Sequence, residues 1–313
     1  MAESLITVAK QVGILFILMS VGFVCSKRKL VDDRAIKGIV EILVVFVTPC
    51  LIVNAFRRPF EPHLLDGLGW ALGGAVISHA LGILCAHLIR TKDKTKESVL
   101  RFGIIFSNAG FMGIPLEQAI LGNDGVFFGA VYVALFNFLC WSYGLIVMCG
   151  SLKDLKIASL AINPGTVGIA AGLPFFLFSW SLPSVLDVPM KMIADLNTPL
   201  AMIVVGYYLA RADFSSVIKS RQAYFATFLR LIAIPLSVLF VFFALKTVFS
   251  LNGTMVTSIV IAASAPMAAL TSMLATRYDR DISLSVGLVA GTTLLSILTM
   301  PPIIGLAITV FRP

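Results

Sequence analysis

The sequence predicts an all-α polytopic membrane protein, and three observations carry this prediction. Hydrophobic residues occupy 58% of the 313 positions and charged residues only 13%, whereas soluble domains contain about 25% charged residues. The mean hydropathy is +0.98. Apolar segments follow one another along the whole chain, separated by short polar connections.

We expect ten membrane spans if roughly 20 apolar residues make one crossing. The connections between them are too short to form a soluble domain. The expected spans are residues 8–26, 38–56, 67–89, 99–121, 126–149, 163–182, 189–210, 222–246, 254–276 and 282–310.

Several function classes are disfavoured by the same composition. The net charge of +8 would suggest nucleic acid in a soluble protein, but here the basic residues lie in short loops between apolar runs. The five cysteines form no CxxC pair, so neither a metal site nor a disulfide framework is expected. No nucleotide-binding or catalytic motif occurs. We therefore expect no enzyme activity, no cofactor and no nucleic-acid partner.

The distribution of positive charge predicts the orientation. Most of the 24 lysines and arginines lie in the connections after spans one, three, five, seven and nine. Cytoplasmic loops retain such residues, so both termini are expected outside the cytoplasm of a cell membrane. The opposite side holds Lys10, Arg57, Arg58, Lys191, Lys246 and Arg312.

Ten spans divide into two halves of five, residues 1–156 and 157–313, which enter the membrane from opposite sides. Such inverted repeats are common in transporters and predict weak internal similarity. Thr48-Pro49 in span two corresponds to Thr198-Pro199 in span seven, each followed by an apolar run. The two halves are therefore expected to have the same fold in opposite topology.

Span four contains the stretch SNAGFMGIPLEQ at residues 107–118, which should not form an ordinary helix. Its two glycines and its proline weaken or interrupt the backbone hydrogen bonds. Span nine has a comparable small, proline-broken stretch, AASAPMAALTS at residues 262–272. Breaks at corresponding places in two repeats indicate a binding site near the membrane midplane. The alternative is a structural kink that neighbouring helices satisfy.

These residues carry a family resemblance. The segment NAGFMGIPL at residues 108–116 resembles the fourth-span motif of the auxin efflux carrier family, and residues 265–301 are similar to the C-terminal pattern of that family. The likeness covers nearly the whole chain. Bacterial members are described as permeases for malate, malonate or other organic acids. Plant members have an asparagine near both crossing prolines, whereas here Ser264 precedes Pro266, so an auxin-like substrate is not implied.

The resemblance implies an inverted-repeat fold of the bile/arsenite/riboflavin transporter superfamily. Spans four and nine would be broken and would cross, with the substrate near the crossing. Spans one, two, six and seven would form a scaffold, and spans three to five and eight to ten a transport unit. A homodimer through the scaffold would also be expected.

The expected substrate site lies at the two breaks. The amide-rich start of each resumed half-helix attracts an anion such as a carboxylate, and the Asn108 side chain can donate to it. Glycine lets a ligand approach the backbone. The expected substrate-binding residues are Asn108, Gly110, Gly113, Pro115, Ser264, Pro266 and Thr271.

Three ionisable residues are candidates for proton coupling. Glu117 and Asp195 are carboxyls inside expected spans, where they are costly and often functional; either could instead be hydrated at the outer headgroups. His79 could titrate near neutral pH or be a packed core histidine.

Arg230 is expected to extend to the cytoplasmic interface, and Trp70, Trp141 and Trp180 to anchor at the interfaces.

The sequence therefore predicts a secondary transporter for small organic anions. A proton gradient is the first hypothesis for its driving force, potential-driven uniport the second and sodium symport the third. A membrane-embedded sensor that binds a ligand without moving it is the alternative from another class.

Overall fold

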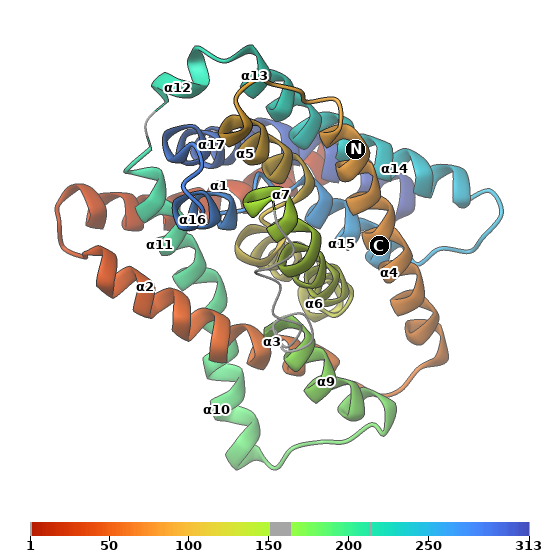
Figure 1. Ribbon diagram of the computed structural model, residues 1–313. Coiled ribbons are helices and arrows are strands. Elements are labelled where there is room, and N and C mark those ends of the chain that lie inside the picture. Colours follow the sequence, from red (N-terminus) through yellow and green to blue (C-terminus); the bar gives the residue numbers. More distant parts are fainter. Residues whose placement is uncertain (1, 151–163, 213, 313) are drawn as a thin grey trace.

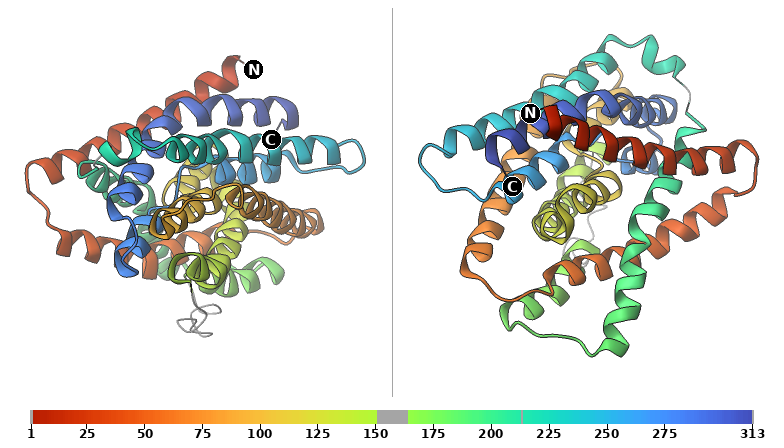
Figure 2. Two further views of the ribbon diagram at one scale, coloured as in Figure 1. Left: turned by 45° about the horizontal axis from the view of Figure 1, so that its top comes forward. Right: turned by 180° about the vertical axis from the view of Figure 1, so that it is seen from behind.

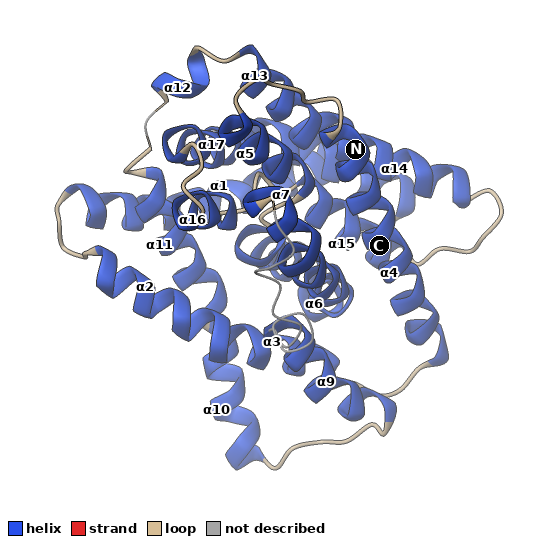
Figure 3. Cartoon of the chain, in the orientation of Figure 1, coloured by secondary structure: helices blue, strands red, loops and turns tan. Residues whose placement is uncertain are grey.

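The protein is helical throughout its regular structure. The computed structural model describes residues 2–150, 164–212 and 214–312, and these contain no strand apart from one isolated β-bridge (Figures 1 and 3). Helices satisfy their backbone groups within one segment, as a chain in hydrocarbon must. The expected boundary between the repeats, at residues 156 and 157, lies outside the described residues.

The helices follow the expected spans closely. In the first half they are α1 (Ala2–Lys27), α2 (Asp33–Ile42), η1 (Leu43–Val47), α3 (Thr48–Phe56), α4 (Pro62–Ala86), α5 (Lys94–Ile105), η2 (Ala109–Gly113), α6 (Ile114–Leu139), η3 (Cys140–Gly144) and α7 (Leu145–Cys149). In the second half they are α9 (Pro164–Leu177), α10 (Ser184–Asp195), α11 (Asn197–Leu209), α12 (Ser215–Ile218), α13 (Arg221–Phe228), η4 (Leu229–Ala233), α14 (Ile234–Leu245), α15 (Gly253–Ser264), α16 (Leu270–Arg277) and α17 (Ile282–Phe311).

Among the described residues, seven helical stretches are long and apolar enough to cross a membrane. The chain is therefore a multi-pass membrane protein. The count of ten spans stays a prediction, because the expected spans four and nine are divided into shorter pieces and the described part of span six, Thr166–Leu177, is a short apolar helix. Gly122, at φ 64° and ψ −150°, further divides the stretch Ala109–Cys149 into two helical parts.

Proline explains three of the four π-helical turns. The turns η1, η2 and η4 each come directly before a helix whose second residue is proline: Pro49, Pro115 and Pro235. Proline lacks an N–H and its ring clashes with the carbonyl one turn earlier. Widening the preceding turn accommodates both effects, and such turns are frequent at functional sites.

The helix α15 is buried among other helices of the bundle. The helix α15 contacts α6, α17, α4 and α14, and every residue from Met255 to Ser264 is buried. A helix that is apolar on all sides belongs in the core. On the outside of this core, α1 packs against α11 and α17, and α3 packs against α9 and α10 (Figure 2).

Glycines allow α1 and α11 to touch along their backbones. A Cβ added at Gly22 would lie 2.0 Å from the carbonyl oxygen of Ile203, and one at Gly206 would lie 1.9 Å from that of Met19. Small residues at a crossing let membrane helices approach closely. At the end of α11, Arg211 and Tyr207 bond the Asp33 carboxylate of α2.

We expect Gly206→Ala to destabilise the protein, because its methyl group would overlap a backbone atom that cannot rotate away. The cost should be about 1–3 kcal/mol or more, as for other overpacked sites. Thermal unfolding in detergent would measure it. Gly13→Ala in α1 is the matched control, since no atom lies within 4 Å of the added Cβ. Equal melting temperatures for the two variants would contradict the close crossing.

Candidate functional site

The two interrupted segments meet and pair through their backbones. The helix α5 ends at Ile105 and α15 ends at Ser264, and the next residue of each chain segment is extended. The Asn108 N–H donates to the Pro266 carbonyl at 2.7 Å, and the Ala268 N–H donates to the Phe106 carbonyl at 2.9 Å. Ser107 and Met267 form an antiparallel bridge between them. Each break thus satisfies backbone groups that the other leaves free.

Helical structure resumes after each break, at Ala109 in η2 and at Leu270 in α16. The first amides of a helix have no carbonyl one turn earlier, and they carry a partial positive charge. Two such ends therefore lie on either side of the paired segment. An anion there gains attraction without needing a lysine or arginine.

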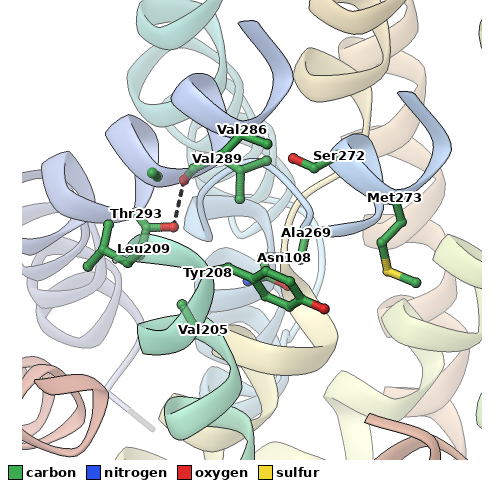
Figure 4. Close-up of a pocket in the computed structure, with 11 residues that line it drawn as sticks. Asn108, Val205, Tyr208, Leu209, Ala269, Ser272, Met273, Val286, Val289 and Thr293 are labelled. Atoms are coloured by element: carbon green, nitrogen blue, oxygen red, sulfur yellow. Dashed lines mark hydrogen bonds between the residues drawn. The ribbon is translucent and has the colours of Figure 1, made fainter. Parts of the chain in front are cut away.

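Two cavities open beside the paired segment, and Asn108 and Ala269 line both. The larger cavity has a volume of about 300 Å³ and lies against α2, η1 and the end of α6. Phe111, Phe136 and Trp141 form much of its apolar wall. The smaller cavity, about 50 Å³, lies between α11, α16 and α17. Figure 4 shows its lining, with Tyr208 from α11 and Val289 from α17.

Asn108 is the polar group best placed to bind a ligand. Its side chain is 5% exposed, and its Nδ2 has no hydrogen-bond partner among the described residues. An unsatisfied buried donor costs about 1–3 kcal/mol unless a ligand or water accepts from it. This side chain lines both cavities. Gly110 lines the larger cavity as well, with open space at its Cα.

The other expected substrate residues are not among those that line these two cavities. Gly113 packs against Ala109 and Ala262, while Pro115 is buried at the start of α6. The Ser264 hydroxyl donates to the Val260 carbonyl of its own helix at 2.6 Å. Pro266 contributes its carbonyl to the pairing with Asn108. Thr271 is fully buried and its Oγ1 has no partner among the described residues.

Glu117 is buried inside the protein. It is 1% exposed, and neither carboxyl oxygen has a hydrogen-bond partner among the described residues. Its carboxyl lies against Gly129, where an added Cβ would be 1.7 Å from Oε2. The nearby Ser258 hydroxyl donates to the Gly125 carbonyl. The alternative in which Glu117 is hydrated at the outer headgroups is therefore wrong.

Asp195 does not line either of the cavities beside the paired segment, whereas the His79 ring lies 6.0 Å from that of Phe106, a residue of this segment. Asp195 is exposed and lines a separate polar cavity of about 290 Å³ with Lys191 and Asn197. His79 is 1% exposed; its Nδ1 bonds the Ala75 carbonyl at 2.8 Å, and its ring packs against Tyr132 at 4.9 Å.

The expectation that Arg230 extends to the cytoplasmic interface is wrong. Its side chain does not reach the cytoplasmic interface but is completely buried. It donates to the carbonyls of Ile104, at 3.1 Å, and Ala263. Hydropathy places Arg230 in a span, but only the packing of α5 and α15 around it decides that the guanidinium points inward.

The cavity residues that were not predicted as binding residues include Trp141, Glu41 and Tyr208. Trp141, expected at the membrane interface, lines the larger cavity, and Glu41 lies at the same cavity. A carboxyl inside an apolar span was a usable signal for Glu41. Tyr208 lines the smaller cavity. Nothing in its local sequence distinguishes it from the adjacent Tyr207, which bonds Asp33 instead.

The fold and the site define a multi-pass helical membrane protein with two paired breaks in its core and two cavities beside them. The chain belongs to a family described as membrane transport protein, whose sequence model matches residues 7–304. This is the auxin efflux carrier family that the sequence resembles. The chain is also similar to an uncharacterized transporter of Methanothermobacter thermautotrophicus, with 23% identity over 295 residues, covering 91% of this chain and 93% of that protein.

Proposed function

We propose that the protein is a secondary transporter of small organic anions, carboxylates such as malate or malonate. The observation that carries this proposal is the unpartnered Nδ2 of Asn108, placed between two resumed helices and beside two cavities. A carboxylate there would accept from the amide and from the helix ends. Membership of a membrane transport family supports movement of the ligand.

The walls of the larger cavity refine the choice of substrates to test. Its lining is mainly apolar, and no lysine or arginine occurs among its described residues. A second carboxylate of the substrate would have no cationic partner there, and Glu41 would repel it. The panel of candidates should therefore contain monocarboxylates of similar size beside the dicarboxylates.

The proposed architecture is ten spans in two inverted repeats, with both termini outside the cytoplasm of a cell membrane. The paired breaks would belong to a transport unit that moves against a scaffold of α1, α2, α3, α9, α10 and α11, and the scaffold would form a homodimer. Proton coupling through Glu117 is the first scheme. Uniport is the second, since the membrane potential supplies about 2.3 kcal/mol per charge per 100 mV.

Uptake of labelled carboxylates into proteoliposomes tests the proposal. We expect saturable uptake of at least one substrate, which an imposed pH gradient or potential should change. A thermal-shift screen of the same panel identifies ligands beforehand, because binding raises apparent stability. Ligand binding without flux under any gradient would contradict transport and indicate a membrane-embedded sensor.

A further inference from the structure

Arg230 occupies a position related equally to both broken helices. One guanidinium nitrogen donates to the carbonyl of Ile104, the next-to-last residue of α5. The other terminal nitrogen donates to the carbonyl of Ala263, the next-to-last residue of α15. A single side chain from η4 therefore joins the C-terminal ends of the two half-helices.

The electrostatic potential between the C-terminal ends of α5 and α15 favours a cation. The C-terminal end of a helix carries roughly half a negative charge, so two such ends together attract about one positive charge. In secondary transporters, half-helix C-terminal ends and free carbonyls near the midplane are the usual ligands of a coupling sodium ion or proton. Here the guanidinium supplies that charge and fills the space between the two carbonyls.

No acidic side chain among the described residues forms an ion pair with Arg230. Ionisable side chains that interact electrostatically with it are Tyr132, Cys85 and His79. The Tyr132 hydroxyl is within hydrogen-bond distance of Ser78 and Ser107, and the latter lies in the paired segment. A buried arginine without a carboxylate is costly, unless the helix ends and carbonyls stabilise it.

We propose that Arg230 is a built-in cation that takes the place of a coupling metal ion between the two broken helices. It holds their C-terminal ends together, and the substrate site therefore needs no sodium or potassium ion there. The independence from a coupling ion rests on the proposed transport function, whereas the cation site between the two helix ends does not. Removing the guanidinium should open this place to a small cation from solution.

Chemical rescue tests whether Arg230 occupies a cation site between the two helix ends. Arg230→Met keeps the length and removes the charge, so we expect a lower melting temperature in detergent that millimolar guanidinium or methylguanidinium partly restores. Arg230→Lys should lie between the wild type and Arg230→Met. The matched control is Arg280→Met, because Arg280 also donates to the last carbonyls of a helix, those of Met148 and Cys149, but away from the breaks. Guanidinium should not stabilise this control variant.

The ion dependence of uptake tests the consequence. Wild-type uptake should be equal in sodium, potassium and choline salts, and Arg230→Met should lose about tenfold or more, as expected for two lost charge-assisted hydrogen bonds. A sodium requirement in the wild type would overturn the proposal. So would a folded Arg230→Met protein that guanidinium does not stabilise. If Arg230→Met does not fold, a lysine variant that is equally unstable overturns it. An absence of all wild-type flux would instead refute the proposed function, and the rescue of stability would remain interpretable.

Discussion

Asn108→Ala should weaken substrate binding by about tenfold to a hundredfold while leaving the fold intact. The side-chain Nδ2 has no partner among the described residues, so removing it breaks no hydrogen bond that the structure shows. A hydrogen bond to a charged ligand is worth about 1.5–3 kcal/mol. The backbone N–H of residue 108, which pairs with Pro266, remains in the variant. Ligand-dependent thermal shifts and uptake rates would measure the loss.

Asn137→Ala is the matched control for this experiment. Asn137 lines the same larger cavity, but its Nδ2 already donates to the Val133 carbonyl at 2.9 Å. Its removal should therefore change binding much less. Asn108→Asp should be worse than Asn108→Ala, because it places a negative charge where an anion is expected to bind. Unchanged affinity in Asn108→Ala would remove this residue from the site.

Glu117→Gln should abolish the response of uptake to a pH gradient while preserving ligand binding. The carboxyl is buried and has no hydrogen-bond partner in the part of the chain that the structure describes, so its charged form is poorly compensated and a bound proton removes that cost. Glutamine imitates the protonated side chain and cannot release a proton. One coupled proton contributes about 1.4 kcal/mol per pH unit, or a tenfold change in accumulation. The variant should lose this factor.

The control for Glu117→Gln is Glu61→Gln, which changes an exposed carboxyl. Uptake by that variant should follow the pH gradient as in the wild type. If Glu117→Gln still responds to pH, the proton carrier is another group, and Asp195 and His79 are the next to test. If neither wild type nor variant responds, potential-driven uniport replaces proton coupling.

The predicted breaks illustrate how far local sequence reaches. Glycine and proline at residues 110–115 have the same local effect in any environment, so an irregular segment there could be predicted. The pairing of Asn108 with Pro266 joins residues far apart in sequence, and no periodicity reports such a contact. The family resemblance suggested it, while the hydrogen bonds specify which carbonyl each amide meets.

The environment of the ionisable residues could not be predicted from the local sequence. Hydropathy placed Glu117 and Arg230 inside spans, but it contains no information about which side of a helix faces the protein. Glu117 is buried because Gly129 leaves space for its carboxyl, and Arg230 because two helices end beside it. Both facts depend on neighbours from other spans.

The sequence by itself determined the class of fold, the positions of the helices and the two breaks, since these follow from composition and from backbone chemistry within one segment. The tertiary structure decided which polar groups remain without partners, which ones line a cavity and which charge lies between the helix ends. Those properties arise from the close approach of distant segments. Hydrocarbon makes every unpaired polar group costly, so the pairing of the breaks and the few unpaired groups beside them are where function is expected.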